Sequence, residues 1–226
     1  MAKNKLPTII SFILDRSGSM ETIRGSVISG FNEYINGLKL GKDTKKALFS
    51  LTTFDTDGID TPYVLTPVSL VKDLTKKTFV PRSGTPLYDA VVNAVEKLSD
   101  SVEPNQPVIV AIMTDGEENS SREHTQECMR DLVQELKKKG NYTFVFMGAN
   151  QDSWSNARNL GFDMGNVVDF AASELGTKNV MRSFGNATAM LCSAMAEAPV
   201  GAAMNSANFF NQNDAQSLTP TPKLSK

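Results

Sequence analysis

The stretch that most constrains the fold is a short apolar run near the N-terminus that ends abruptly in an aspartate. Residues 8–14 are rich in β-branched and aromatic side chains and are bounded by polar turn residues. This composition predicts a strand buried on both faces, as in a parallel sheet. Asp15 then lies at the carboxyl end of that strand. Ser17 and Ser19 follow it and begin a turn into a helix, because apolar side chains recur near the i, i+3, i+4 spacing from residue 23 to 38.

This position along the chain favours a ligand site. In open α/β sheets, ligands bind in the crevice at the carboxyl ends of the strands, and the N–H groups of a helix start add positive potential there. The pattern Asp15-x-Ser17-x-Ser19 is therefore predicted to form a strand-to-helix loop at the ligand-binding edge of such a sheet.

Length and composition narrow the class of protein. A chain of 226 residues allows one core, in a domain of roughly 200 residues. The net charge of -2 gives no general attraction to nucleic acid or to anionic membranes. The N-terminal residues do not resemble a signal peptide, and no apolar stretch approaches the ~20 residues that span a bilayer. Cys128 and Cys192 lie far apart without a CxxC pattern, which favours reduced thiols in a cytoplasmic protein.

Strands and helices are predicted to alternate along the rest of the chain. Strands are expected over residues 45–54, 61–65, 107–113, 142–147 and 167–170, and helices over 87–98, 122–139, 153–160 and 177–198. The second of these strands follows the turn at residues 55–58 and is expected to pair antiparallel at an edge. The turn itself lacks the glutamate that closes a calcium loop. This alternation predicts an α/β fold, with a doubly wound, mainly parallel sheet in a three-layer α/β/α arrangement.

Four segments are expected along the chain. Residues 1–6 form an N-terminal extension, 7–172 the α/β domain, 173–199 a helical segment packed on that domain, and 200–226 a flexible polar tail. Within the predicted helix at 122–139, Cys128 is expected to face inward, whereas His124 is expected to be exposed.

Thr85 has two interpretations. It stands directly before Pro86, which suits the first position of a helix, so Thr85 alone is most simply an N-cap residue. The second interpretation depends on Asp115, which follows the most apolar run of the chain in a Thr-Asp-Gly turn and is therefore also expected at the end of a buried strand. Thr85 can then be an oxygen donor to a site that it shares with Asp15 and Asp115.

Right-handed connections between parallel strands place all strand-to-helix loops at one edge of the sheet. Five side chains are therefore predicted to converge there: Asp15, Ser17, Ser19, Thr85 and Asp115. All five offer oxygen and none offers nitrogen or sulfur, which selects a hard cation. Mg²⁺ is the expected ion, with Mn²⁺ and Ca²⁺ as alternatives.

These residues resemble a known family. Asp15, Ser17, Ser19, the distant Thr85 and Asp115 are similar to the complete metal-ion-dependent adhesion site of von Willebrand factor A domains. The resemblance covers roughly residues 7–172. The segments Asp15-Arg16-Ser17-Gly18-Ser19-Met20 and Ser83-Gly84-Thr85-Pro86-Leu87 resemble the intracellular branch of that family, in bacteria and bacteriophages, more than the extracellular adhesive branch.

The resemblance implies a non-enzymatic protein-interaction module. Its sheet would carry one antiparallel edge strand. Its site would bind an Asp or Glu carboxylate of a partner protein through the cation, because three of the five donors are neutral and an open position remains on the ion. Intracellular relatives suggest an AAA+ ATPase or a stress-response complex as the partner.

Two alternatives remain open. Phosphatases of the haloacid dehalogenase type also use Mg²⁺ beside an aspartate that follows a buried strand, but they need a second aspartate where this chain has Ser17. Only Glu117 or Glu118 lies near enough in sequence to act as a base for such chemistry. A component of an RNA–protein complex is the other alternative, although the chain has neither a basic stripe nor an aromatic stacking set.

Overall fold

The computed structural model describes residues 6–149, 153–199, 202 and 205–210. Its centre is a six-stranded sheet in the order β3-β2-β1-β4-β5-β6. The strands are β1 (Ile9–Asp15), β2 (Leu48–Asp55), β3 (Gly58–Pro67), β4 (Val108–Thr114), β5 (Tyr142–Ala149) and β6 (Val167–Phe170). All neighbouring strands are parallel except β2 and β3, which pair antiparallel at one edge. The predicted fold class, including the antiparallel edge strand, is confirmed.

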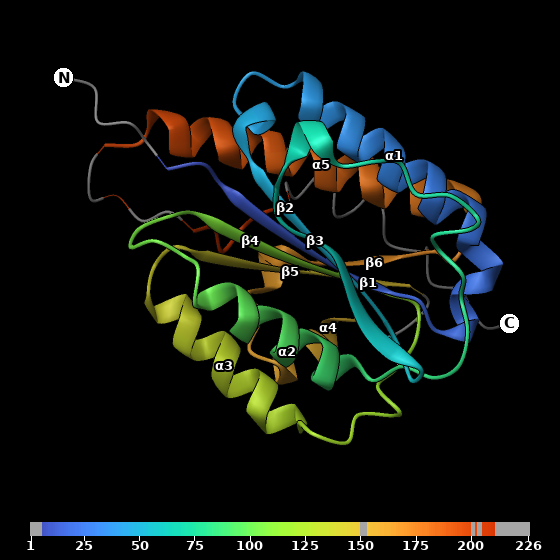
Figure 1. Cartoon of the computed structure of the whole chain (residues 1–226). Helices are drawn as coiled ribbons and strands as arrows, with labels where there is room; N and C mark the ends of the chain where they lie inside the picture. Colours follow the sequence, from blue (N-terminus) through green and yellow to red (C-terminus); the bar gives the residue numbers. More distant parts are fainter. Residues whose placement is uncertain (1–5, 150–152, 200–201, 203–204, 211–226) are drawn as a thin grey trace, which may run out of the picture.

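Helices cover both faces of this sheet (Figure 1). They are α1 (Arg24–Leu40), α2 (Leu87–Ser99), α3 (Gln126–Lys138), α4 (Ser153–Asn159) and α5 (Glu174–Glu197). Helices α1 and α5 lie on one face, and α2, α3 and α4 lie on the other. Alternate residues of β1 enter the two separate cores: Phe12 packs under α1 and α5, whereas Ile13 packs under the opposite helices. A continuous apolar run is therefore needed in the central strands, because both of their faces are buried.

The α3 helix begins four residues later than predicted. The carboxylate of Asp89 in α2 accepts hydrogen bonds from the backbone N–H groups of Arg122, Glu123 and His124. These bonds hold the segment as a loop on α2, and the helix begins at Gln126. His124, which was expected to be exposed, is half-buried in this loop.

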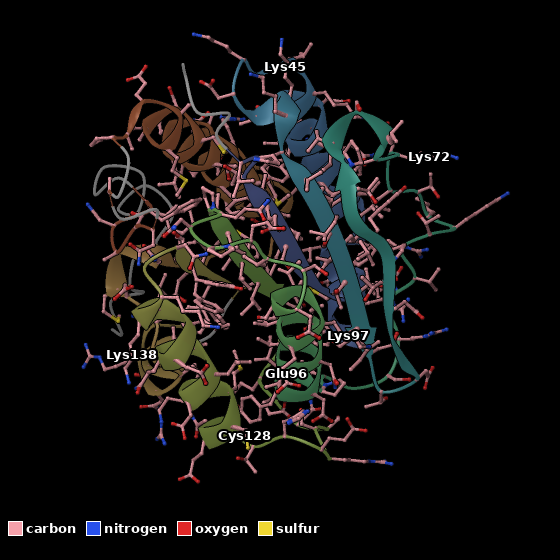
Figure 2. All side chains as sticks on the ribbon, turned by 60° about the vertical axis from the view of Figure 1, so that its left-hand side comes forward. Lys45, Lys72, Glu96, Lys97, Cys128 and Lys138 are labelled. Carbon is pink, nitrogen blue, oxygen red and sulfur yellow. The ribbon has the colours of Figure 1, made fainter. Side chains whose placement is uncertain are left out.

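The prediction that Cys128 faces inward is wrong. Cys128 is exposed at the start of α3 (Figure 2). Its N–H donates to the Oγ1 of Thr125, the residue that caps the helix. The buried side of the helix is formed by Met129, Val133 and Leu136, at a spacing that excludes Cys128. Of the helices in the described part of the chain, none has the length and apolar character needed to cross a bilayer.

The C-terminal segment packs on the domain further than predicted. Phe209 and Phe210 are buried, and the ring of Phe209 lies 5.6 Å from that of Phe184 in α5. The buried amide of Asn166 donates to the carbonyl of Ser206 and accepts from the N–H of Phe209. Within the tail predicted for residues 200–226, Phe209 and Phe210 therefore pack on the domain. Residues 211–226 lie outside the described residues.

This packing has a measurable consequence. Replacing Phe209 with alanine is expected to lower the free energy of unfolding by about 3 kcal/mol, because it removes a buried aromatic ring from the core. Denaturant unfolding of the full chain measures the change. Asn208→Ala, at the exposed neighbouring position, is the control. Equal stabilities of the two variants would contradict the packing of this segment.

Candidate metal centre

Asp15 lies at the carboxyl end of β1 and is completely buried. Its Oδ1 accepts a hydrogen bond of 2.6 Å from the N–H of Ser17, and its Oδ2 accepts one of 2.6 Å from the Oγ1 of Thr114. Thr114 ends β4, the neighbouring parallel strand, so the sheet itself brings these two side chains together. Burial raises the pKa of Asp15 to about 6, because removing the carboxylate from water disfavours its charged form.

Ser17, Ser19 and Asp115 continue the site from two loops. The Oγ atoms of Ser17 and Ser19 lie 3.1 Å apart, and the Oγ of Ser19 donates to the Oδ1 of Asp115 at 2.6 Å. Asp115 directly follows β4 and is half-buried, and this burial raises the pKa of its carboxyl above the ordinary value. Two loops that are 96 residues apart in sequence therefore form one cluster of oxygen atoms.

Thr85 completes this cluster, and its capping interpretation is wrong. The N-cap residue of α2 is Pro86, and the N–H groups of Tyr88 and Asp89 in the first turn donate to Glu118 and Ser121 instead of Thr85. Thr85 is 2% exposed. A Cβ atom placed on Gly116 would lie 3.2 Å from the Oγ1 of Thr85, 3.5 Å from the Oγ of Ser19 and 4.0 Å from the Oγ of Ser17. Three hydroxyl groups therefore converge on Gly116, where a Cβ atom would press on the hydroxyl of Thr85 and contact the other two.

The structure thus brings together all five residues that the sequence predicted for one site. Their donors are two carboxylates and three hydroxyl groups, a set of hard oxygen atoms that suits Mg²⁺, Mn²⁺ or Ca²⁺. Among the described residues, no group of three or more His, Cys, Asp or Glu side chains is placed to hold a metal ion. This cluster differs from such a group because most of its donors are neutral.

Two residues that support the site were not predicted. Thr114 donates to Asp15, and its place before Asp115 in the Thr-Asp-Gly turn is a signal that the sequence contains. Asn119 holds Thr85 from both sides: its Oδ1 accepts from the N–H of Thr85 at 2.9 Å, and its own N–H donates to the carbonyl of Thr85 at 3.2 Å. No local pattern reveals this role, because the two residues meet only after the loops have folded against each other.

Glu118 fixes the same loop. Its carboxylate accepts hydrogen bonds from the N–H groups of Ser120 and Ser121, from the Oγ of Ser121, and from the N–H of Tyr88 in the first turn of α2. Glu118 therefore ties the loop after β4 to the helix that follows Thr85.

Comparison with known proteins identifies the family. The model of the von Willebrand factor type A domain matches residues 10–182. The chain therefore belongs to the von Willebrand factor type A domain family. No curated protein sequence matches the chain.

Solved structures share this fold at low sequence identity. Proximal thread matrix protein 1 from the mussel byssus is 15% identical, with a TM-score of 0.59 over 83% of this chain and 47% of that chain. The pilus adhesin SpaC from Lactobacillus rhamnosus GG is 12% identical, with a TM-score of 0.64 over 83% of this chain and 30% of that chain. Manganese-loaded TRAP protein from Plasmodium vivax is 20% identical, with a TM-score of 0.52 over 75% of this chain and 70% of that chain. The chain thus spans about half the length of the mussel protein and under a third of the adhesin.

Proposed function

We propose that this chain is a protein-interaction module with a complete metal-ion-dependent adhesion site. Asp15, Ser17, Ser19, Thr85 and Asp115 would hold a divalent cation, and a partner protein would bind there through an Asp or Glu carboxylate. The observation that carries the proposal is the convergence of three hydroxyl groups on Gly116, beside the carboxylates of Asp15 and Asp115.

The donor set explains why such a site would bind an acidic group. When bound, the cation would supply the positive charge that attracts a partner's carboxylate. The protein contributes only two carboxylates, while Ser17, Ser19 and Thr85 contribute no charge. Thr114 and the N–H of Ser17 orient the buried carboxylate of Asp15, and Asn119 holds Thr85 in place. The site would therefore have its donors in position before a partner arrives.

Binding is favoured over catalysis by the residues that surround the cluster. Ser17 occupies the position where a phosphatase of similar layout needs a second aspartate, and its hydroxyl is not a general acid at neutral pH. Glu118, one of the two candidate bases, is engaged by four hydrogen bonds within its own loop and with α2. We therefore propose a non-enzymatic role.

The proposal also includes the identity of the ion, the class of partner and the location of the protein. Mg²⁺ is the ion we expect, and the manganese-loaded state of the TRAP structure makes Mn²⁺ a suitable probe. A cytoplasmic protein of bacterial or bacteriophage type is supported by the sequence resemblance and by the two free cysteines. An AAA+ ATPase or a stress-response complex is the class of partner that we propose.

Removal of the metal tests this function. The full chain is expected to bind Mg²⁺ or Mn²⁺ in a calorimetric titration. It should also retain proteins from the native host in Mg²⁺ and release them in EDTA, while its circular dichroism stays unchanged. Recovery of the same partners in chelator would contradict the metal bridge. Turnover of a general phosphoester substrate that depends on Mg²⁺ would instead support the enzyme.

A further inference from the structure

The turn between β2 and β3 does more than join two strands. Asp55, the last residue of β2, is completely buried at its side chain. Its Oδ1 accepts from the N–H groups of Asp57 and Gly58 at 2.8 and 3.1 Å, which forms the turn. Its Oδ2 accepts from the Nε atoms of two arginines, Arg16 at 2.7 Å and Arg82 at 3.0 Å. One carboxylate therefore links three separate segments of the chain.

Each of these arginines belongs to a different loop of the candidate metal centre. Arg16 lies between Asp15 and Ser17, and Arg82 lies three residues before Thr85. The backbone joins the same two loops, because the N–H of Arg82 donates to the carbonyl of Arg16 at 2.9 Å. Asp55 thus adds an ionic link where two donor-bearing loops already touch.

The turn also contacts the two residues that follow Arg82. The Oγ of Ser83 donates to Asp57 at 3.1 Å, and the N–H of Gly84 donates to the Oγ1 of Thr56 at 3.2 Å. Three consecutive residues before Thr85 are therefore held by three consecutive residues of the turn.

The backbone of this segment needs such contacts. Ser83 has a φ of 56°, in the left-handed region that residues with a side chain seldom adopt. Such a conformation persists only where the surrounding structure holds it. The turn shares this role with Gly18, whose N–H donates to the carbonyl of Ser83 at 3.0 Å, so the contacts of the turn are part of what holds the backbone two residues before Thr85.

We infer that the β2–β3 turn, residues 55–57, is a positioning element for the candidate metal centre, and that it acts on Thr85 mainly through the link between Asp55 and Arg82. This inference rests on the proposed function. Neither Asp55 nor Arg82 needs to touch the metal ion; they fix the loop that presents the Thr85 hydroxyl.

A purely electrostatic role for Arg82 and a positioning role predict opposite changes in metal affinity when Arg82 is neutralised. A guanidinium group near a cation site repels the cation, so neutralising Arg82 would strengthen metal binding if charge were its only influence. If Arg82 positions Thr85, neutralising it weakens metal binding. The sign of the change therefore separates the two roles. Arg82 suits the test because its side chain is 47% exposed, whereas replacing the buried Asp55 would leave two arginines without their shared partner.

The test is calorimetric titration of the full chain with Mn²⁺. Arg82→Gln is expected to weaken Mn²⁺ binding about tenfold, as changes to residues that orient metal ligands do. Arg82→Lys is expected to restore most of the affinity, because Arg82 contacts Asp55 through a single nitrogen that an ammonium group can replace. Arg130→Gln, which removes an arginine that is 40% exposed at its side chain and pairs with Asp131 on α3, is the matched control and should leave the affinity unchanged.

A double variant tests whether Arg82 acts on metal binding through Thr85. In the Thr85→Ala variant, Arg82→Gln is expected to cause no further loss of Mn²⁺ affinity, because the donor that it positions is already absent. The inference is overturned if Arg82→Gln leaves the affinity unchanged or raises it, or if the same loss persists in the Thr85→Ala background. If the unmodified chain binds no Mn²⁺, the proposed function itself fails.

Discussion

Replacing Asp15 or Asp115 with alanine is expected to abolish Mn²⁺ binding and partner capture while the sheet remains folded. These two residues supply the only carboxylates among the five predicted donors. The loss of affinity should exceed about 100-fold, since residues that merely orient ligands already cost 10- to 100-fold when they are replaced. The fold is expected to survive because packing of the two apolar cores, rather than either carboxylate, holds the helices on the sheet.

Titration calorimetry and capture of partners from the native host measure this prediction, with circular dichroism as the check of the fold. Asp131→Ala is the matched control, because Asp131 is a 70% exposed carboxylate on α3, away from the candidate site. The proposed metal bridge is wrong if Asp15→Ala captures the same partners as the unmodified chain does in Mg²⁺, and if the unmodified chain still captures them in chelator.

Asp15→Asn is expected to stabilise the metal-free protein at pH 7 by up to about 3 kcal/mol. The pKa of Asp15 is raised from 3.8 to about 6 by burial, so the folded state binds a proton more tightly than the unfolded chain does. The resulting penalty is absent below the unfolded pKa, grows as the pH rises from about 4 to 6, and is complete above 6. Asparagine avoids this penalty because it carries no charge at any of these values.

Urea unfolding in EDTA at several values between about pH 4 and pH 8 measures this difference. The advantage of Asp15→Asn should be largest above about pH 6 and should vanish near pH 4. Addition of Mn²⁺ at pH 7 should reverse the order, because only the unmodified chain would gain stability from the bound ion. A stability difference that does not change across this pH range would contradict a raised pKa for Asp15. Asp131→Asn serves as the exposed control.

The proton on the carboxyl of Asp15 also makes metal binding depend on pH. A metal ion must displace it from Asp15, so the apparent affinity for Mn²⁺ is expected to fall as the pH drops below about 6. The free-energy cost of burying the charged carboxylate of Asp15, which raises its pKa, would thus be offset in the metal-bound state by the positive charge of the ion.

Much of the fold could be predicted because its signals are local. The apolar runs of β1, β4 and β5 are continuous, since both faces of each strand are buried. The alternation of such runs with amphipathic segments was enough to predict the mainly parallel sheet and its helical layers. The five candidate donors could be predicted for a related reason, because parallel strands with right-handed connections must present their following loops at one edge.

The predictions that failed depended on contacts between distant segments. The start of α3 is set by Asp89 in another helix, and Cys128 lies on the side of α3 that does not pack on the sheet. Phe209 lies in a segment of polar composition, but it finds a place beside Phe184 once α5 has packed on the sheet. Neither outcome has a signal in the neighbouring sequence.

The sequence by itself therefore determined the class of fold and predicted which five oxygen-bearing side chains meet at one edge of the sheet, since strand burial and the loops that follow buried strands are properties of short segments. Only the tertiary structure decided that Thr85 faces Gly116 instead of capping α2. It also decided that Asn119 and the turn at residues 55–57 hold Thr85 and its loop in place. The physical reason is that these hydrogen bonds join residues from 26 to 34 positions apart, and such pairings exist only after the sheet has brought the loops to one edge.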